Sequence, residues 1–275
     1  MHSTEKVIAI TGASSGLGYA AVQLFAQKGW MVYAAARRLE KIPTGKNISM
    51  LKLDVTDSQS NQDFIRQIVS QSGRIDTLLN NAGYPEFGPA EEVSMANVRR
   101  EYETNFFGAV ELTQLVLPQM RKQGRGRILN VSSLVGNSYL PLGAYYNSTK
   151  AALQQWSDVL DLEVRPFGVR SIIIQPGDTE TGFNAVWREK VRKNLTENSI
   201  YRSLVEGIEK MGNRPGTVSA SADELAQVFY KAATDKKVKL RYYNSWRDRA
   251  WVAFSRKHPG LYHFLLTKAV ARFCK

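Results

Sequence analysis

The chain has 275 residues, 43% of them hydrophobic and 23% charged, which is ordinary for a globular protein with one large domain or two small ones. The single cysteine, Cys274, excludes an intrachain disulfide, and the three histidines are not spaced with acids as metal ligands, so we expect no metal. The net charge of +12 is uneven, since residues 236–275 hold eleven Lys or Arg and one acid. A near-neutral body with a basic end is not the pattern of a nucleic-acid-binding protein.

We expect neither a signal peptide nor a membrane-spanning helix. The first apolar run, residues 7–10, is short and lacks a cleavage-like tail. The longest uncharged stretch, residues 128–149, is broken by Asn, Ser, Gly and Pro, which is the wrong composition for a membrane span. These features predict a cytoplasmic protein, with peripheral membrane association left open.

Apolar, β-branched runs alternate with amphipathic segments along most of the chain. The runs predict strands at Val7–Thr11, Met31–Ala36, 48–55, 75–79, 127–131, Val169–Gln175 and 238–243. Helical spacing predicts helices at Gly16–Gln27, around 64–69, and at 95–121, 145–165 and 219–234. This alternation predicts an α/β fold, with a doubly wound, seven-stranded parallel sheet and helices on both faces. Ligands of such sheets bind at the carboxyl ends of the strands.

A glycine-rich segment joins the first predicted strand to the first helix. Glycines there let the backbone approach a pyrophosphate, and the helix N-terminus supplies free N–H groups. An ordinary glycine-rich turn is the alternative, but the position at the first strand–helix junction favours nucleotide binding. The predicted contacts are Gly12, Ser14, Ser15, Gly16, Leu17 and Gly18.

The end of the second strand should select the cofactor. An acid there would favour NAD, whereas this chain has Arg37 and Arg38. Guanidinium groups suit a 2′-phosphate, so we predict NADP(H), with a pair of solvated arginines as the alternative. Asp54 and Val55, at the end of the third strand, are candidate adenine contacts.

Tyr146 and Lys150 are four residues apart and share one face of a predicted helix. The spacing alone is common and describes many ordinary surface pairs. Other motifs accompany this pair in a fixed order. They are Thr11-Gly12-x-x-x-Gly16-x-Gly18, Asn80-Asn81-Ala82-Gly83, Asn105, Asn130-Val131-Ser132-Ser133, Tyr146-x-x-x-Lys150 and Pro176-Gly177.

With these motifs the sequence resembles the classical short-chain dehydrogenases/reductases over about residues 5–245. Residues 81–89 and 181–183 are most similar to the branch grouped with 17β-hydroxysteroid dehydrogenases. The resemblance implies a Rossmann-type catalytic domain at residues 1–243 with a substrate loop at about 178–218. A C-terminal helical extension, residues 244–275, would follow without forming an independent domain.

The resemblance also implies four catalytic residues. Hydride transfer to a ketone develops alkoxide charge on the substrate oxygen, so an acid must contact that oxygen. Tyr146 is expected to be this acid, and Lys150 to favour its phenolate and bind the nicotinamide ribose. Ser133 is expected to hydrogen-bond the substrate oxygen. Asn105 would hold a water that passes protons from Lys150 to solvent, unless it is a helix-interior residue satisfied by backbone.

Further cofactor contacts are expected after the fourth and sixth strands. Asn81, Ala82 and Gly83 would let the backbone pass close to the nicotinamide ribose. Thr179 and Thr181, beyond the Pro-Gly pair, are candidates for the carboxamide and pyrophosphate, and the sequence does not rank them. The expected cofactor contacts outside the glycine-rich segment also include Tyr146, Lys150, Pro176 and Gly177.

Apolar and aromatic side chains in the loops after the strands favour a hydrophobic substrate, although several of them could simply pack in the core. The candidate substrate contacts are Ser133, Val135, Leu140, Tyr146, Phe183 and Trp187. The leading prediction is an NADP(H)-dependent oxidoreductase that interconverts a hydrophobic alcohol and its ketone or aldehyde, with a steroid-, retinoid- or acyl-lipid-like substrate. The alternatives are a non-catalytic nucleotide-binding sensor or scaffold, and a peripheral membrane protein on the same fold.

The C-terminal extension is basic and aromatic. A basic amphipathic helix can lie on an anionic membrane, but the segment could equally be a lid or a subunit contact. Family members often pair through the two long helices, so a homodimer or homotetramer is expected. The helical pattern places Tyr262, Leu265, Leu266, Ala269, Val270 and Phe273 opposite Lys268, Arg272 and Lys275.

Overall fold

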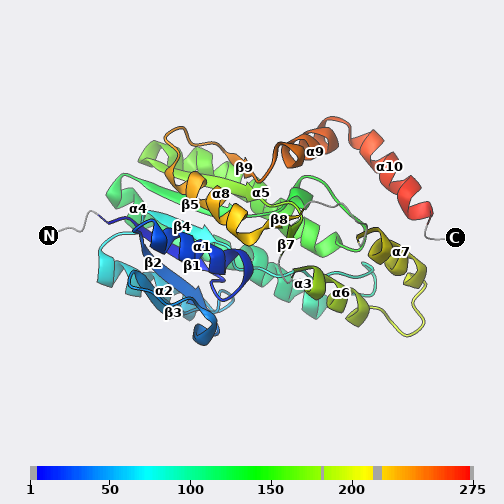
Figure 1. The fold of residues 1–275 in the computed structure, drawn as a ribbon, viewed down its shortest axis with the longest axis horizontal. Coiled ribbons are helices and arrows are strands. Elements are labelled where there is room, and N and C mark those ends of the chain that lie inside the picture. The colour runs from blue at the N-terminus through cyan, green and yellow to red at the C-terminus, as the bar shows by residue number, and fades with distance from the viewer. Residues whose placement is uncertain (1–4, 181–182, 213–218, 273–275) are drawn as a thin grey trace.

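Seven parallel strands form the central sheet of the molecule, in the order β3-β2-β1-β4-β5-β6-β9 (Figure 1). The computed structural model describes residues 5–180, 183–212 and 219–272. The strands are β1 (Val7–Thr11), β2 (Met31–Ala36), β3 (Ile48–Lys52), β4 (Thr77–Asn80), β5 (Gly126–Val131), β6 (Val169–Gln175) and β9 (Arg241–Tyr243). The strand order reverses between β1 and β4, so the predicted doubly wound, Rossmann-type sheet is confirmed.

Helices cover both faces of this sheet (Figure 1). They are α1 (Gly16–Gln27), α2 (Ser58–Ser72), α4 (Gly108–Gln123), α5 (Ala144–Val164) and α8 (Ala222–Thr234). Side chains of a strand alternate between its faces, so β1 contributes to two cores. Ile8 and Ile10 pack with Phe25 of α1 and Phe229 of α8. Val7 and Ala9 pack on the opposite face, with residues of α2, α4 and α5.

Three predicted strands are longer than the observed ones. β3 ends at Lys52, although the buried side chains of Leu53 and Val55 continue the apolar pattern as far as the turn before α2. β9 begins only at Arg241, and β4 only at Thr77. Buried residues therefore continue beyond the residues that form strand hydrogen bonds. An apolar run in the sequence predicts the buried segment and not the exact bounds of the strand.

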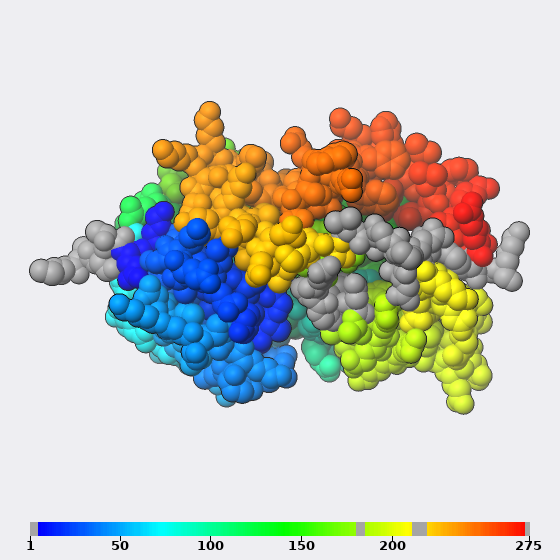
Figure 2. Space-filling model, in the orientation of Figure 1, coloured from blue at the N-terminus to red at the C-terminus, as the bar shows by residue number. Residues whose placement is uncertain are grey.

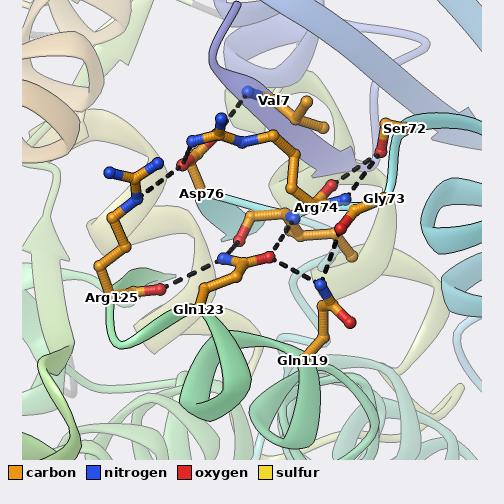
Figure 3. A network of polar contacts seen from close by, with 9 residues as sticks. Val7, Ser72, Gly73, Arg74, Asp76, Gln119, Gln123 and Arg125 are labelled. Carbon is orange, nitrogen blue, oxygen red and sulfur yellow. Dashed lines mark hydrogen bonds and ion pairs between the residues drawn. The ribbon is translucent and has the colours of Figure 1, made fainter. Parts of the chain in front are cut away.

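A polar network at the amino ends of β1 and β4 explains why β4 begins only at Thr77 (Figure 3). The Gln123 side chain donates to the Ile75 carbonyl and accepts from the Ile75 N–H, both at 2.9 Å. Asp76 accepts from the Val7 N–H at 2.8 Å and from Arg74 Nε at 3.0 Å. Gln119 bridges Gly73 and Gln123. Side chains thus bind backbone groups that a longer strand would pair.

The helix predicted at residues 95–121 forms, but its hydrogen-bond repeat is not uniform. It consists of α3 (Met95–Tyr102), a π-helical turn at Glu103–Phe107, and α4. A π-helical turn inserts one extra residue into the helical repeat and is frequent at functional sites. Asn105 lies in this turn, so the predicted long helix changes its hydrogen-bond repeat at the position where a site residue was expected.

The predicted substrate loop contains two helices, α6 (Phe183–Lys193) and α7 (Arg202–Gly212). Its two ends are joined by a short parallel pair, β7 (Thr179–Glu180) with β8 (Ala220–Ser221). Ser221 then caps α8 together with Glu224 in a capping box, so the helix predicted from residue 219 begins at Ala222.

The C-terminal extension forms two helices, α9 (Trp246–Lys257) and α10 (Pro259–Ala271). Figure 1 shows them at the same end of the molecule as α6 and α7. No helix in the described ranges is long and apolar enough to cross a membrane. Tyr262 of α10 is buried, and its hydroxyl donates to the Tyr139 carbonyl at 2.8 Å. The extension therefore folds back onto the rest of the chain.

Candidate active site

A cavity of about 1210 Å³ opens at the carboxyl ends of the central strands. Its walls include the loops after β1, β2, β3, β4, β5 and β6, and they extend to α6, α7, α9 and α10. The reversal of strand order between β1 and β4 leaves room for a ligand at this edge. The polar network of Figure 3 lies where β1 and β4 begin, at the opposite edge.

The glycine-rich loop after β1 is built for close backbone approach. Gly12 has φ +67°, and a Cβ on it would lie 2.9 Å from the Ala82 Cα. A Cβ on Gly18 would lie 2.3 Å from the Gly12 carbonyl oxygen. Neither position can accept a side chain without displacing backbone, because real Cβ contacts are longer. Gly18 is not part of the cavity wall, so it packs α1 against the loop.

Hydrogen bonds tie this loop to the segment after β4. Thr11 Oγ1 accepts from the N–H groups of Asn81 and Ala82, at 3.0 and 2.9 Å. The Asn81 side chain donates to the Thr11 carbonyl at 3.0 Å. Ser15 begins α1 without a side-chain cap, so the first N–H groups of the helix remain available to a ligand. Such a cradle suits the pyrophosphate of a dinucleotide.

The other predicted cofactor contacts surround the same cavity. Arg37 and Arg38 are exposed at the end of β2 and line it, and Arg100 and Thr104 lie in its wall as well. Predicted contacts that line the cavity are Gly12, Ser14, Ser15, Gly16, Leu17, Arg37, Arg38, Asp54, Val55, Asn81, Ala82, Gly83, Tyr146, Lys150, Pro176, Gly177 and Thr179. The Thr179 hydroxyl donates to the Gly177 carbonyl at 3.1 Å. Thr181 lies outside the described residues.

Tyr146 and Lys150 project from the first turns of α5 into the cavity, and both are buried. Lys150 Nζ donates to the Val131 carbonyl at 2.9 Å and lies 5.7 Å from the centroid of the Tyr146 ring. The Ser133 side chain forms a hydrogen bond with Tyr146. Three of the four predicted catalytic residues therefore converge on one point of the cavity wall.

Asn105, the fourth, lies behind that wall and clamps the backbone of Tyr84. Its Oδ1 accepts from the Tyr84 N–H at 3.0 Å, and its Nδ2 donates to the Tyr84 carbonyl at 2.9 Å. A Cβ on Gly83 would lie 3.0 Å from Asn105 Oδ1 and 3.5 Å from Lys150 Nζ. Asn105 and Lys150 are thus close to each other on either side of Gly83. The hydrogen bonds of Asn105 with the Tyr84 backbone also agree with the alternative, in which this asparagine is a buried residue satisfied by backbone groups.

Burial dominates the ionisation of this cluster. It raises the pKa of the Tyr146 phenol, and the nearby Glu101 carboxylate raises it further. Burial lowers the pKa of Lys150 to about 8, against a smaller opposing effect of Glu101. We expected Lys150 to bring the phenol pKa down. In the structure desolvation of the phenolate outweighs any such effect, so Tyr146 is protonated at neutral pH.

Glu101 was not predicted from the sequence. It is fully buried one turn before Asn105, and its Oε1 accepts from the Glu86 N–H at 2.8 Å. Its Oε2 is buried and has no hydrogen-bond partner among the described residues. Burial raises the pKa of Glu101 to about 8. A glutamate four residues before a candidate catalytic asparagine, on the same helix face, was the available signal.

The far part of the cavity is apolar. Among the predicted substrate contacts, Ser133, Val135, Leu140, Tyr146 and Trp187 line it. Phe87 stacks on Tyr146 with ring centroids 5.3 Å apart and meets Trp187 at 6.1 Å. Phe183 begins α6, but its side chain lies outside the described part of the structure. The wall residues that were not predicted as substrate contacts include Pro141, Ile208, Trp251, Leu266, Ala269 and Val270.

A doubly wound sheet with a dinucleotide cradle beside a buried Tyr–Lys pair and a partly buried serine defines a nucleotide-dependent oxidoreductase. The family model described as short chain dehydrogenase matches residues 6–192. The chain therefore belongs to the short-chain dehydrogenase family, as its motifs predicted, and it is an enzyme of the oxidoreductase class.

Individual relatives agree with this assignment. The chain is 37% identical over 227 residues to a 3-ketodihydrosphingosine reductase of Bacteroides thetaiotaomicron, covering 78% of this chain and 81% of that one. It is 35% identical over 204 residues to an NADPH-dependent 1-acyldihydroxyacetone phosphate reductase of Schizosaccharomyces pombe, with 72% and 68% covered. A short-chain dehydrogenase structure from Streptomyces avermitilis superposes with a TM-score of 0.77 at 29% identity, covering 96% of each chain. None of these is named a hydroxysteroid dehydrogenase, so that branch stays a prediction.

Proposed function

We propose that this enzyme is an NADP(H)-dependent reductase of a hydrophobic, lipid-like ketone or aldehyde, acting through Tyr146. The observation that carries the proposal is the continuity of one cavity. It begins at Arg37 and Arg38, passes Tyr146, and ends between apolar side chains of α6, α7 and α10. A cofactor and a long apolar substrate can therefore meet at the phenol.

NADP(H) fits the residues at the nucleotide end. The cradle around Gly12 has no room for a side chain, and the open N-terminus of α1 favours an anionic group. Arg37 and Arg38 stand where an acid would favour NAD, and their guanidinium groups suit the 2′-phosphate. One relative is named NADPH-dependent, in agreement with this choice.

The state of Tyr146 favours the reductive direction. When bound, NADPH supplies the hydride, and the substrate oxygen must receive a proton as its negative charge develops. Because burial raises the pKa of Tyr146, the phenol is protonated at neutral pH and can donate that proton. The hydrogen bond of Ser133 with Tyr146 supports a role for this serine in orienting the same oxygen. Lys150 lies close enough to Tyr146 to stabilise the phenolate that remains.

The apolar end of the cavity favours a lipid-like substrate. Trp187, Ile208, Leu266 and Val270 supply walls without formal charge, so an acyl chain could lie there without desolvating an ion. Two relatives are named as reductases of lipid-type ketones, 3-ketodihydrosphingosine and 1-acyldihydroxyacetone phosphate. A long-chain ketone is accordingly our first choice, ahead of a steroid or retinoid.

A single substitution tests the catalytic proposal. Tyr146→Phe removes the proton donor and keeps the ring that packs on Phe87, so we expect a loss of about 100- to 10,000-fold in kcat. The affinity for NADPH, measured by fluorescence titration, should stay within about twofold, since general-acid catalysis needs the hydroxyl and binding does not. NADPH oxidation with long-chain ketones, steroids and retinoids is the readout.

The neighbouring tyrosine provides a matched control. The Tyr145 hydroxyl donates to the Ala90 carbonyl and lies outside the cavity, so Tyr145→Phe should retain activity. A Tyr146→Phe enzyme that reduces a good substrate at a normal rate would overturn the assignment. Activity that is confined to steroids would keep the mechanism and replace the long-chain substrate.

We also propose that the protein forms a homo-oligomer through α4 and α5. Large apolar side chains are exposed on α5, namely Val159 and Leu162, and directly beside the two helices, namely Phe107 before α4 and Phe167 after α5. Leu162 is 72% exposed, and contiguous exposed apolar residues of this kind mark protein contacts. None of these four residues lines the cavity, so self-association through them would leave the cavity accessible.

A further inference from the structure

Helix α10 is apolar on two opposite faces. One face packs inward, with Tyr262 buried and Leu266, Ala269 and Val270 in the cavity wall. The other face points outward and carries Leu261, Phe264 and Leu265, which are 50%, 55% and 50% exposed. Positions 261, 264 and 265 follow the i, i+3, i+4 spacing of one helix face. The sequence-based expectation placed Leu265 and Leu266 together, whereas the structure separates them.

Exposed cationic side chains are numerous in α9 and α10. They are Arg247, Arg249, Arg256, Lys257, Lys268 and Arg272, against the single acid Asp248. Asp248 is engaged in the capping box of α9 with Ser245. In the described ranges, none of the six cations lies within ion-pair distance of an acid. The segment from 246 to 272 is therefore a largely uncompensated positive surface.

Two of these cations lie over exposed aromatic rings. Arg247 is 5.8 Å from the ring of Trp246, and Lys268 is 5.5 Å from the ring of Phe264. Trp246 is the most exposed aromatic side chain of the pair of helices. Aromatic rings with adjacent Lys or Arg are the residues that favour the headgroup level of a bilayer. Figure 2 shows α9 and α10, in orange to red, as one continuous band along the edge of the molecule.

We propose that the pair of helices α9 and α10 docks on an anionic membrane surface, with Leu261, Phe264 and Leu265 inserted among the lipids. With 13 residues α10 is too short to span a bilayer, but it can lie in the interface. A second copy of the chain is the less favourable occupant, because it would bring two uncompensated positive surfaces together. Nucleic acid would match the charge and leave the apolar face uncovered.

The docking would have a consequence for substrate entry, which rests on the reductase function proposed above. The outward face of α10 would contact lipid while its inward face lines the cavity, through Leu266, Ala269 and Val270. Trp251 of α9 lines the cavity as well and is partly exposed. A lipid-like ketone could therefore pass from the bilayer to the cavity along α9 and α10 with little exposure to water.

Vesicle flotation of the full chain tests the docking without requiring any activity. The wild-type protein should float with vesicles of phosphatidylcholine and phosphatidylserine, and far less with phosphatidylcholine alone. The double substitution Phe264→Ser and Leu265→Ser should lower partitioning at least tenfold. Lys257→Glu and Lys268→Glu should each lower it about fivefold or more, because each adjacent cation contributes to binding at an anionic surface.

The matched control is Ile200→Ser, which removes the most exposed large apolar side chain of the described residues, at 82% exposure, from a different segment. It should float as the wild type does. NADPH titration of every variant checks that the fold is intact. The proposal would be overturned if the wild-type protein did not float with the vesicles. It would also be overturned if the variants in α9 and α10 floated as well as the wild type. If a variant in α9 or α10 loses self-association in sedimentation without vesicles, the surface binds a second copy of the chain and not lipid.

Failure of the two proposals can be told apart. If flotation follows the expected pattern but no lipid-like ketone is reduced, the docking stands and the substrate class is wrong. If ketones in detergent are reduced while flotation fails, the reductase proposal stands and membrane docking is wrong.

Discussion

Burial controls the chemistry of the individual residues in this site. Tyr146, Lys150 and Glu101 share one desolvated region, and for each the neutral form is favoured. Other charged groups that act on Glu101 are Glu86, which raises its pKa, and Lys190, which lowers it. Lys190 is itself paired with Glu86 at 2.9 Å. The charge at Tyr146 therefore depends on a buried acid outside the four predicted catalytic residues.

Glu101→Gln should change the pH profile of reduction. The Glu101 carboxylate raises the pKa of both Tyr146 and Lys150, so a neutral Gln lowers both values. Reduction also needs charged Lys150 to stabilise the phenolate, so its rate should fall as pH rises through the pKa of Lys150, which is about 8. The high-pH limb of kcat/KM should therefore move to lower pH in the variant.

The pH window of this effect follows from the ionisation of Glu101 itself. Because its pKa is about 8, Glu101 is mainly neutral below that value, and the two enzymes should behave alike there. They should diverge above pH 8, in profiles measured from pH 6 to 10. Profiles that superimpose over the whole range would show that Glu101 only fills space. Glu103→Gln, a polar change in the same turn of the chain and outside the cavity wall, is the control.

Arg37→Ala should affect NADPH much more than NADH. A charge-assisted hydrogen bond to the 2′-phosphate contributes about 1.5–3 kcal/mol, which corresponds to an increase of roughly 10- to 100-fold in the KM for NADPH. NADH lacks this phosphate, so its KM should change little. Steady-state kinetics with both cofactors measure the effect, and Arg66→Ala, on the exposed face of α2, is the control. Equal increases for both cofactors would contradict the role.

At the scale of elements, the loops after β1 and β4 hold the cofactor cradle together. Thr11 and Asn81 cross-link them, and Gly18 brings α1 into direct contact with the Gly12 carbonyl. The π-helical turn places Asn105 behind the same segment, against Tyr84. The contacts of Thr11 with Asn81 and of Asn105 with Tyr84 join residues that are 70 and 21 positions apart along the chain.

Gly18→Ala should impair both cofactor binding and stability. The new Cβ would lie 2.3 Å from the Gly12 carbonyl oxygen and 2.6 Å from Asn81 Nδ2, so the loops must separate. Overpacking of this kind typically destabilises a protein by about 1–3 kcal/mol. Thermal unfolding should show a lower Tm, and NADPH titration a higher Kd. Gln23→Ala, on the exposed face of the same helix, should leave both unchanged; the same result for Gly18→Ala would contradict the packing role.

At the scale of the whole molecule, the two edges of the sheet have different tasks. The amino edge is closed by the side-chain network around Asp76 and Gln123 (Figure 3). The carboxyl edge is open to the cavity, which α6, α7, α9 and α10 then enclose. The apolar surface of α5 lies apart from both, and this separation allows self-association without blocking the cavity.

Leu162→Glu should dissociate the proposed homo-oligomer. Leu162 is largely exposed in one chain, so a charge is tolerated in the monomer but is unfavourable in a buried contact. Sedimentation equilibrium should show a smaller species for the variant, with NADPH binding retained. Gln23→Glu, on the exposed face of α1 across the sheet, gives the same change in charge outside α4 and α5 and is the control. A wild-type protein that sediments as a monomer would contradict the proposal.

The sequence by itself determined the fold class and most of the site. Continuous apolar runs such as Val7–Thr11 mark strands buried on both faces, and the glycine and arginine positions follow from their place at strand ends. Tyr146, Lys150 and Ser133 were predicted as a cluster, and the structure brings them together. These features are local in sequence or tied to strand ends, which is why a pattern can find them.

Only the tertiary structure decided the remaining features. The burial of Glu101, the raised pKa of Tyr146 and the late start of β4 depend on side chains from distant segments, as does the division of α10 into an inner and an outer face. Desolvation is set by everything that surrounds a group, whereas residue spacing describes only its neighbours along the chain. The sequence therefore placed Tyr146 beside its partners, and only packing revealed that burial raises the pKa of its phenol.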